Sequence, residues 1–125
     1  MDIKTAFLHG DLEETLYLKP PIGIVCPPGK QGWVWELKKA LYGLKQAPRQ
    51  WNLKLHHYMS KDLGFTRLES DWGIYIKREG KTLTIVDIYV DDLFLGSTDF
   101  SYMLALKWIL VSNFHLWTQE RRKAY

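Results

Sequence analysis

Cysteine is nearly absent from this sequence, because Cys26 is the only one in 125 residues. No internal disulfide can form, so a reducing compartment such as the cytoplasm fits the chain. No apolar run reaches the roughly 18 residues that a membrane-spanning helix needs, and the first residues lack the pattern of a signal peptide. Internal repeats and low-complexity segments are also missing. We therefore expect a globular chain with no membrane partner.

A strong excess of charge of either sign is missing as well. The formal net charge is +3, which permits a nucleic-acid partner but does not argue for one, because such domains usually concentrate basic residues on one face. Apolar residues make up 46% of the chain, and six of them are Trp, which excludes a disordered chain. A chain of 125 residues forms one domain at most and can bury about two thirds of its unfolded surface.

The most informative segment covers residues 84–96, which are rich in β-branched and aromatic side chains and predict two short strands. We expect the break between them at Asp91 and Asp92. Tight turns favour Asn-Gly or Asp-Gly, whereas here two adjacent carboxylates, with no glycine beside them, disfavour each other's ionisation. A divalent cation would remove this conflict, because Mg²⁺ takes hard oxygen ligands. The alternative is a polar hairpin tip that happens to be acidic, since acidic turns are common.

Other elements follow from periodicity and from turn residues. We expect strands over residues 2–8, 15–18 and 33–37, and a further strand that begins at residues 74–76 and ends at residues 78–80. A loop rich in proline and glycine should cover residues 20–32. A helix should follow Gly43, because Pro48 suits a first turn and Gly64 suits the position after the end. A second helix, capped by Thr98 or Asp99, should run to about residue 113. The expected apolar stripes are Trp51, Leu55, Tyr58 and Met59 in the first helix, and Leu106, Ile109, Leu110 and Phe114 in the second.

Three blocks of sequence stand in an order that is typical of one family. They are MDIKTAFLHGDL at residues 1–12, KKALYGLKQAPRQW at residues 38–51, and YVDD at residues 89–92, after an apolar strand and before Gly96. Together they resemble the reverse transcriptase (RNA-directed DNA polymerase) of copia-type retrotransposons, over roughly residues 1–115. The resemblance implies an α+β fold in which an antiparallel sheet carries helices on one face, as in a truncated reverse transcriptase palm.

The resemblance also implies a chemistry, which is nucleotidyl transfer assisted by two Mg²⁺ ions, with Mn²⁺ as a substitute. Asp2, Asp91 and Asp92 match the catalytic, metal-binding aspartates. Asp2 and Asp91 would bridge the two metals, Asp92 would assist, and the Ile3 carbonyl would be a further ligand. Phe7 matches the aromatic residue that closes the sugar pocket. The alternative for Asp2 is an ordinary exposed residue at a frayed terminus.

Other residues match positions that contact nucleotide or nucleic acid. Tyr42 and Gly43 match the pair under the incoming nucleotide and the template base, and glycine would allow the backbone to come close. Lys45, Arg49 and Tyr89 are weaker candidates for contact with the template-primer, since a charged outer face is usual for a surface helix. The implied partners are an RNA or DNA template-primer and a deoxynucleoside triphosphate.

The chain also departs from the family. The family usually has an aliphatic residue where Asp87 stands, and we interpret this difference as one that weakens packing. We expect a palm-like domain over residues 1–115 and a divergent tail over residues 116–125, without the initial finger segment, the thumb and the ribonuclease H domain of the family. A second hypothesis is therefore a non-catalytic relic or nucleic-acid-binding piece of a decayed element. The three intact aspartates favour descent from a working enzyme.

Overall fold

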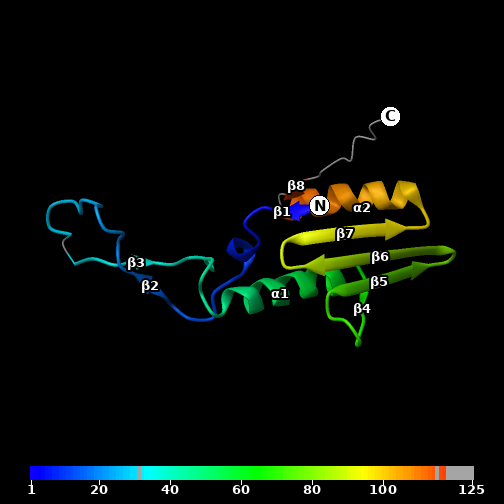
Figure 1. Cartoon of the computed structure of the whole chain (residues 1–125), viewed down its shortest axis with the longest axis horizontal. Coiled ribbons are helices and arrows are strands. Elements are labelled where there is room, and N and C mark those ends of the chain that lie inside the picture. The colour runs from blue at the N-terminus through cyan, green and yellow to red at the C-terminus, as the bar shows by residue number, and fades with distance from the viewer. Residues whose placement is uncertain (31, 115, 118–125) are drawn as a thin grey trace.

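The computed structural model of the chain describes residues 1–30, 32–114 and 116–117. Within these residues an antiparallel six-stranded sheet forms the centre of the molecule (Figure 1). In spatial order its strands are β4 (Thr66–Arg67), β5 (Ile74–Glu79), β6 (Thr82–Tyr89), β7 (Asp92–Ser97), β1 (Asp2–Ile3) and β8 (Leu116–Trp117). The order places the first strand of the chain beside the hairpin of β6 and β7, about ninety residues later in the sequence.

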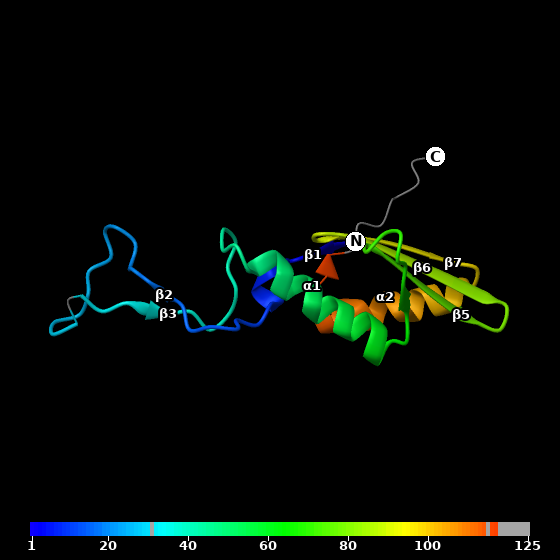
Figure 2. The ribbon, with the colours of Figure 1, turned by 90° about the horizontal axis from the view of Figure 1, so that it is seen from below.

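Two helices cover one face of this sheet (Figure 2): α1 (Ala47–His57) and α2 (Phe100–Phe114). The predicted α+β fold, with an antiparallel sheet and helices on one face, is confirmed. The core lies between the helices and the sheet, and its buried side chains are Ile3, Ala6, Trp51, Leu55, Met59, Phe65, Tyr75, Val86, Leu93, Leu106, Leu110 and Phe114. Neither helix among the described residues is long and apolar enough to cross a membrane.

No helix of the described residues lies on the opposite face of the sheet, and we call it the open face. Side chains alternate along β6, where Thr84 and Val86 are buried while Ile85, Asp87 and Tyr89 are exposed. The interpretation that Asp87 weakens packing is wrong for the core, because this side chain lies on the open face.

Both helices begin and end where the sequence indicates. Pro48 lies in the first turn of α1, a π-helical turn (Tyr58–Asp62) continues that helix, and Gly64 follows with a φ of +72°. Asp99 caps α2, because its Oδ1 accepts a hydrogen bond of 3.0 Å from the Tyr102 amide. The predicted stripes are buried with two exceptions: Tyr58 is half-buried, and Ile109 is exposed.

The predicted strand over residues 2–8 is wrong after Ile3. Thr5 has a φ of +53°, and a 3₁₀ turn (Ala6–His9) follows it. This turn packs against α1, and Gly10 comes so close that an added Cβ would stand 3.1 Å from the Trp51 backbone nitrogen. Packing against the helix therefore ends the strand earlier than the apolar pattern indicates.

The predicted break between the central strands is also misplaced by one residue. β6 ends at Tyr89, which pairs with Asp92, so the two-residue turn consists of Val90 and Asp91. Asp92 is therefore the first residue of β7 and not part of the turn. The short strand β4 was not predicted, because two residues give no measurable alternation.

The segment between the 3₁₀ turn and α1 forms an arm that projects from the body of the molecule (Figure 1). Its strands β2 (Tyr17–Leu18) and β3 (Trp35–Glu36) pair only with each other among the described residues. They confirm two of the predicted strands in shortened form, on either side of the predicted loop.

The division into a domain over residues 1–115 and a tail over residues 116–125 stays a prediction. Leu116 and Trp117 pair with Ile3 and Asp2 as strand β8, so the sheet includes two residues beyond the predicted boundary. The rest of the predicted tail lies outside the described residues.

Candidate functional site

Two of the three predicted catalytic carboxylates lie directly opposite each other in the sheet. Asp2 of β1 is the register partner of Asp92 of β7. The hydrogen bonds on either side run from the Ile3 amide to the Asp91 carbonyl, at 2.7 Å, and from the Leu93 amide to the Met1 carbonyl, at 2.8 Å. This pattern makes Asp2 and Asp92 a non-hydrogen-bonded pair, the kind in which Cα atoms stand about 4.5 Å apart and side chains come closest.

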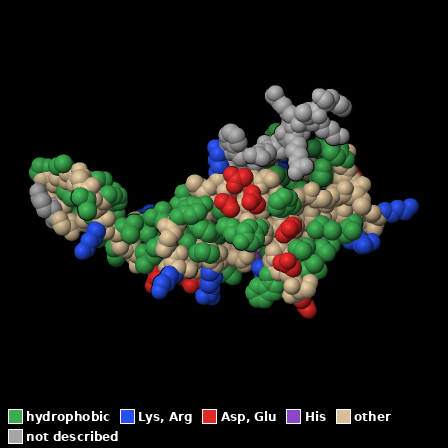
Figure 3. Space-filling view, viewed as in Figure 1, with side chains coloured by type: hydrophobic (Ala, Val, Ile, Leu, Met, Phe, Trp, Pro, Cys, Tyr) green, Lys and Arg blue, Asp and Glu red, His purple; other side chains and the backbone are tan. Residues whose placement is uncertain are grey.

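The third carboxylate, Asp91, is the second residue of the adjacent turn and is half-buried. The Ile3 amide donates a hydrogen bond to the Asp91 carbonyl. Strand β1 therefore contacts both Asp92, its partner in β7, and the turn that carries Asp91. Figure 3 shows acidic side chains gathered where β1 and the tip of the β6–β7 hairpin lie. The structure thus brings Asp2, Asp91 and Asp92 to one end of the hairpin.

The donor set at this end of the hairpin fits a hard divalent cation. Like charges directly opposite each other in a sheet are destabilising, and a cation between Asp2 and Asp92 would remove that repulsion. Mg²⁺ is commonly held by one or two carboxylates together with substrate phosphates. No group of three or more His, Cys, Asp or Glu that could hold a metal ion is found among the described residues. Asp2 and Asp92 are the two carboxylates that would hold such an ion.

Two of the predicted nucleotide-binding residues are in contact with each other. The rings of Phe7 and Tyr42 lie 4.5 Å apart between centroids, at an angle of 51°. The structure thus brings together these two side chains from the first and second motifs, and their roles toward a nucleotide stay predictions. Gly43, next to Tyr42, has a φ of +92°, with nothing within 4 Å of an added Cβ. Its glycine is thus needed for the backbone conformation and not for a close approach within this chain.

The remaining predicted contacts lie in different places. The Ile3 side chain is buried in the core, so only its backbone is available to a ligand. Tyr89 is 75% exposed on the open face, as the cross-strand partner of Asp92. Lys45 and Arg49 are exposed before and within the first turn of α1. Their roles toward nucleic acid stay predictions.

Comparison with known proteins identifies the family. A model of the family described as reverse transcriptase (RNA-dependent DNA polymerase) matches residues 1–125. The chain belongs to the reverse transcriptase family.

Several relatives are retrotransposon polyproteins, which confirms the copia-type resemblance. The chain is 42% identical over 117 residues to the retrovirus-related Pol polyprotein from transposon TNT 1-94 of Nicotiana tabacum, covering 93% of this chain and 9% of the relative. It is 36% identical over 99 residues to the polyprotein from transposon RE1 of Arabidopsis thaliana, covering 79% of this chain and 7% of the relative. It is 38% identical over 97 residues to a putative transposon Ty5-1 protein of Saccharomyces cerevisiae, covering 78% of this chain and 31% of the relative. No solved structure matches the chain.

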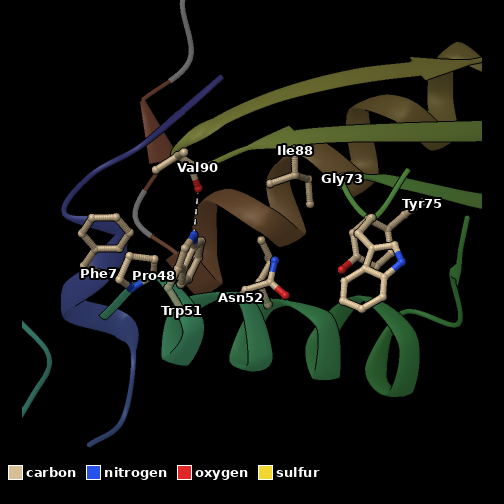
Figure 4. Close-up of a pocket in the computed structure, with 10 residues that line it drawn as sticks. Phe7, Pro48, Trp51, Asn52, Gly73, Tyr75, Ile88 and Val90 are labelled. Atoms are coloured by element: carbon tan, nitrogen blue, oxygen red, sulfur yellow. Dashed lines mark hydrogen bonds between the residues drawn. The ribbon is translucent and has the colours of Figure 1, made fainter. Parts of the chain in front are cut away.

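One residue in contact with the hairpin turn is not among the predicted site residues. The sequence places Trp51 in the apolar stripe of α1 and at the end of the second family block, with no role of its own. Its indole Nε1 donates a hydrogen bond of 2.8 Å to the Val90 carbonyl in the hairpin turn. It also lines a pocket of about 280 Å³ between α1 and the sheet, together with Phe7 and Val90 (Figure 4). The sequence could have indicated this contact, because a buried Trp usually needs a hydrogen-bond acceptor for its N–H.

Proposed function

We propose that this chain provides the metal-binding centre of an RNA-directed DNA polymerase of the copia type. The observation that carries the proposal is the pairing of Asp2 with Asp92, with Asp91 in the adjoining turn. Strands β1 and β7 pair Asp2 with Asp92, although these two residues lie far apart in the sequence, and Asp91 precedes Asp92 in the adjoining turn. Family membership supports the substrate class, which is a template-primer and a deoxynucleoside triphosphate.

The residues of the chain would divide the work as follows. Asp2 and Asp92 hold the cation from two strands, and Asp91 adds a third carboxylate from the turn. When bound, Mg²⁺ supplies charge stabilisation to the primer hydroxyl and to the triphosphate. The Phe7 and Tyr42 rings, already in contact, offer an apolar surface to the sugar and base of the nucleotide.

A non-catalytic, nucleic-acid-binding relic is the second candidate. One observation favours it: no ready-made group of three metal ligands exists among the described residues. Catalysis of phosphoryl transfer consists mostly of positioning the reactants and stabilising charge, so an incomplete set of metal ligands supplies only part of it. We therefore expect the 125-residue chain alone to give no detectable primer extension.

A chimaera separates the two candidates. Residues 1–117 of this chain replace the matching segment of the tobacco polyprotein's reverse transcriptase, and extension of oligo(dT) on poly(rA) is measured with Mg²⁺ and then with Mn²⁺. The unmodified tobacco protein is the positive control. Asp92→Asn removes a proposed ligand, and Asp87→Asn is its matched control, because Asp87 is exposed on the same face of the sheet.

We expect extension by the chimaera and by its Asp87→Asn variant, and a loss of about a hundredfold or more in Asp92→Asn, because misplaced or missing charge at the reacting centre costs at least that much. A chimaera no more active than its Asp92→Asn variant, beside an active tobacco protein, would favour the relic.

A further inference from the structure

The turn that carries Asp91 has an unusual first residue. Its two residues are Val90 and Asp91, and the only described non-glycine residues with a positive φ are Thr5 and Val90, the latter at +57°. A two-residue turn with a positive φ at its first position alone is of type II′, which normally has glycine there. A β-branched residue in this conformation is a genuine outlier, so the surrounding structure must hold it in place.

Two hydrogen bonds hold this turn, one through each of its carbonyl groups. The Ile3 amide donates to the Asp91 carbonyl at 2.7 Å. The Trp51 indole donates to the Val90 carbonyl at 2.8 Å. The first bond belongs to the sheet, whereas the second comes from α1, across the core. Figure 4 shows the Trp51 side chain extending from α1 to this carbonyl.

Trp51 is itself held firmly. Its side chain is 3% exposed, and its ring meets Phe114 of α2 edge to face, with centroids 5.4 Å apart. The His9 ring lies 5.7 Å from it on the side of the 3₁₀ turn. Contacts from α2 and from the segment after β1 thus fix the indole direction, and the donor points at the turn.

We infer that Trp51 is a positioning residue for the metal-binding carboxylates. By holding the Val90 carbonyl, it keeps the turn in its strained conformation, and so keeps Asp91 and the start of β7 in place beside Asp2. This inference rests on the proposed function, since it assigns a role within the same site. It predicts that loss of the indole donor weakens cation binding more than it weakens the fold.

The test is a Mn²⁺ titration of the 125-residue chain, followed by the broadening of amide signals from Tyr89 to Leu93, with thermal unfolding measured in parallel. Trp51→Phe removes the donor and keeps a ring. Tyr75→Phe is the matched control, because Tyr75 is equally buried and its hydroxyl lies 3.3 Å from His56 Nδ1, away from the turn. A double variant, Trp51→Phe with Val90→Gly, removes the steric strain of a β-branched residue in the turn. Glycine accepts a positive φ, so the turn no longer needs the indole hydrogen bond to keep its conformation.

We expect Trp51→Phe to weaken Mn²⁺ binding about fivefold, the equivalent of one ordinary hydrogen bond. Tyr75→Phe should lower the unfolding temperature similarly and leave the Mn²⁺ affinity unchanged, and Val90→Gly should restore the affinity of Trp51→Phe. Equal affinities in the wild type and Trp51→Phe, or equal losses in Trp51→Phe and Tyr75→Phe, would overturn the inference alone. Absence of Mn²⁺ binding at the hairpin of the wild type would overturn the proposed function, and the inference with it.

Discussion

At the scale of single residues, Val90 is a β-branched residue whose backbone has a positive φ, a conformation that its side chain disfavours. Its φ of +57° costs about 1–3 kcal/mol for a residue of this type, whereas glycine loses only about 0.5–1 kcal/mol in chain entropy. We therefore expect Val90→Gly to raise the free energy of unfolding by about 1 kcal/mol. Urea denaturation measures this change. Ile85→Gly, on an exposed strand position, is the control and should lower it. A destabilising Val90→Gly would show that the turn is not strained.

His56 gives the fold a pH dependence. Burial, with smaller contributions from the positive charges of Arg67, His57 and Lys61, lowers the pKa of His56 below its ordinary value of 6.5. The unfolded chain then binds a proton at a higher pH than the folded chain does, so stability is greatest above pH 6.5 and is lost as the pH falls below it.

We expect the free energy of unfolding to fall between pH 7.5 and pH 5.5, the range around the usual histidine pKa. His56→Gln should flatten this slope, whereas His57→Gln, which changes the exposed neighbour, should keep most of it. Denaturation at several pH values measures the slope, and an unchanged slope in His56→Gln would contradict the assignment.

At the scale of elements, the sequence predicts best where one face of an element is buried over several turns. The stripe of Trp51, Leu55 and Met59 is buried as expected, and Asp99 caps α2 as expected. Ile109 fits the helical period but is exposed, because the sheet covers only part of the α2 surface. The strands β1 and β4 are two residues long, and such strands are defined by their partners and not by their own pattern.

The site depends even more on such long-range pairing. Nothing within residues 1–12 indicates that Asp2 would lie beside Asp92, since that register comes from the pairing of β1 with β7. The family resemblance implies that Asp2 and Asp91 share the metals while Asp92 assists, and neither it nor the periodicity predicts that Asp92 is the residue opposite Asp2. The contact of Phe7 with Tyr42 and the bond of Trp51 to Val90 likewise join segments that are distant in sequence.

The arm formed by β2 and β3 should be dispensable for folding. Among the residues that the structure describes between positions 11 and 39, no apolar side chain is buried in the core. Its large exposed apolar residues are Tyr17, Ile22, Ile24, Val25, Trp33, Val34 and Trp35. Since Leu18 pairs with Trp35, a two-residue Asn-Gly turn can replace residues 19–34. We expect the unfolding temperature to change by a few degrees at most and solubility to rise. A large loss of stability would show that the arm is part of the folding unit.

At the scale of the whole molecule, much apolar surface remains uncovered. The open face of the sheet exposes Ile85, Tyr89 and Phe94, and the Phe94 side chain is 64% exposed. The arm exposes further large apolar side chains. Apolar patches of this kind favour association.

We therefore expect a marginally stable chain whose light scattering rises with concentration, and Phe94→Lys should reduce that association. A sharp, reversible and concentration-independent unfolding transition above ~65 °C, the upper end for ordinary mesophile domains, would contradict this expectation.

The central claim is that the opposed carboxylates of β1 and β7 bind a divalent cation. The most direct measurement is a Mn²⁺ titration of the labelled chain, in which paramagnetic broadening locates the ion. We predict broadening centred on the amides from Tyr89 to Leu93 in the wild type and in Asp87→Asn, and its loss in Asp92→Asn and in Asp2→Asn. Broadening that persists unchanged in Asp92→Asn, or that centres on another part of the sheet, would contradict the account.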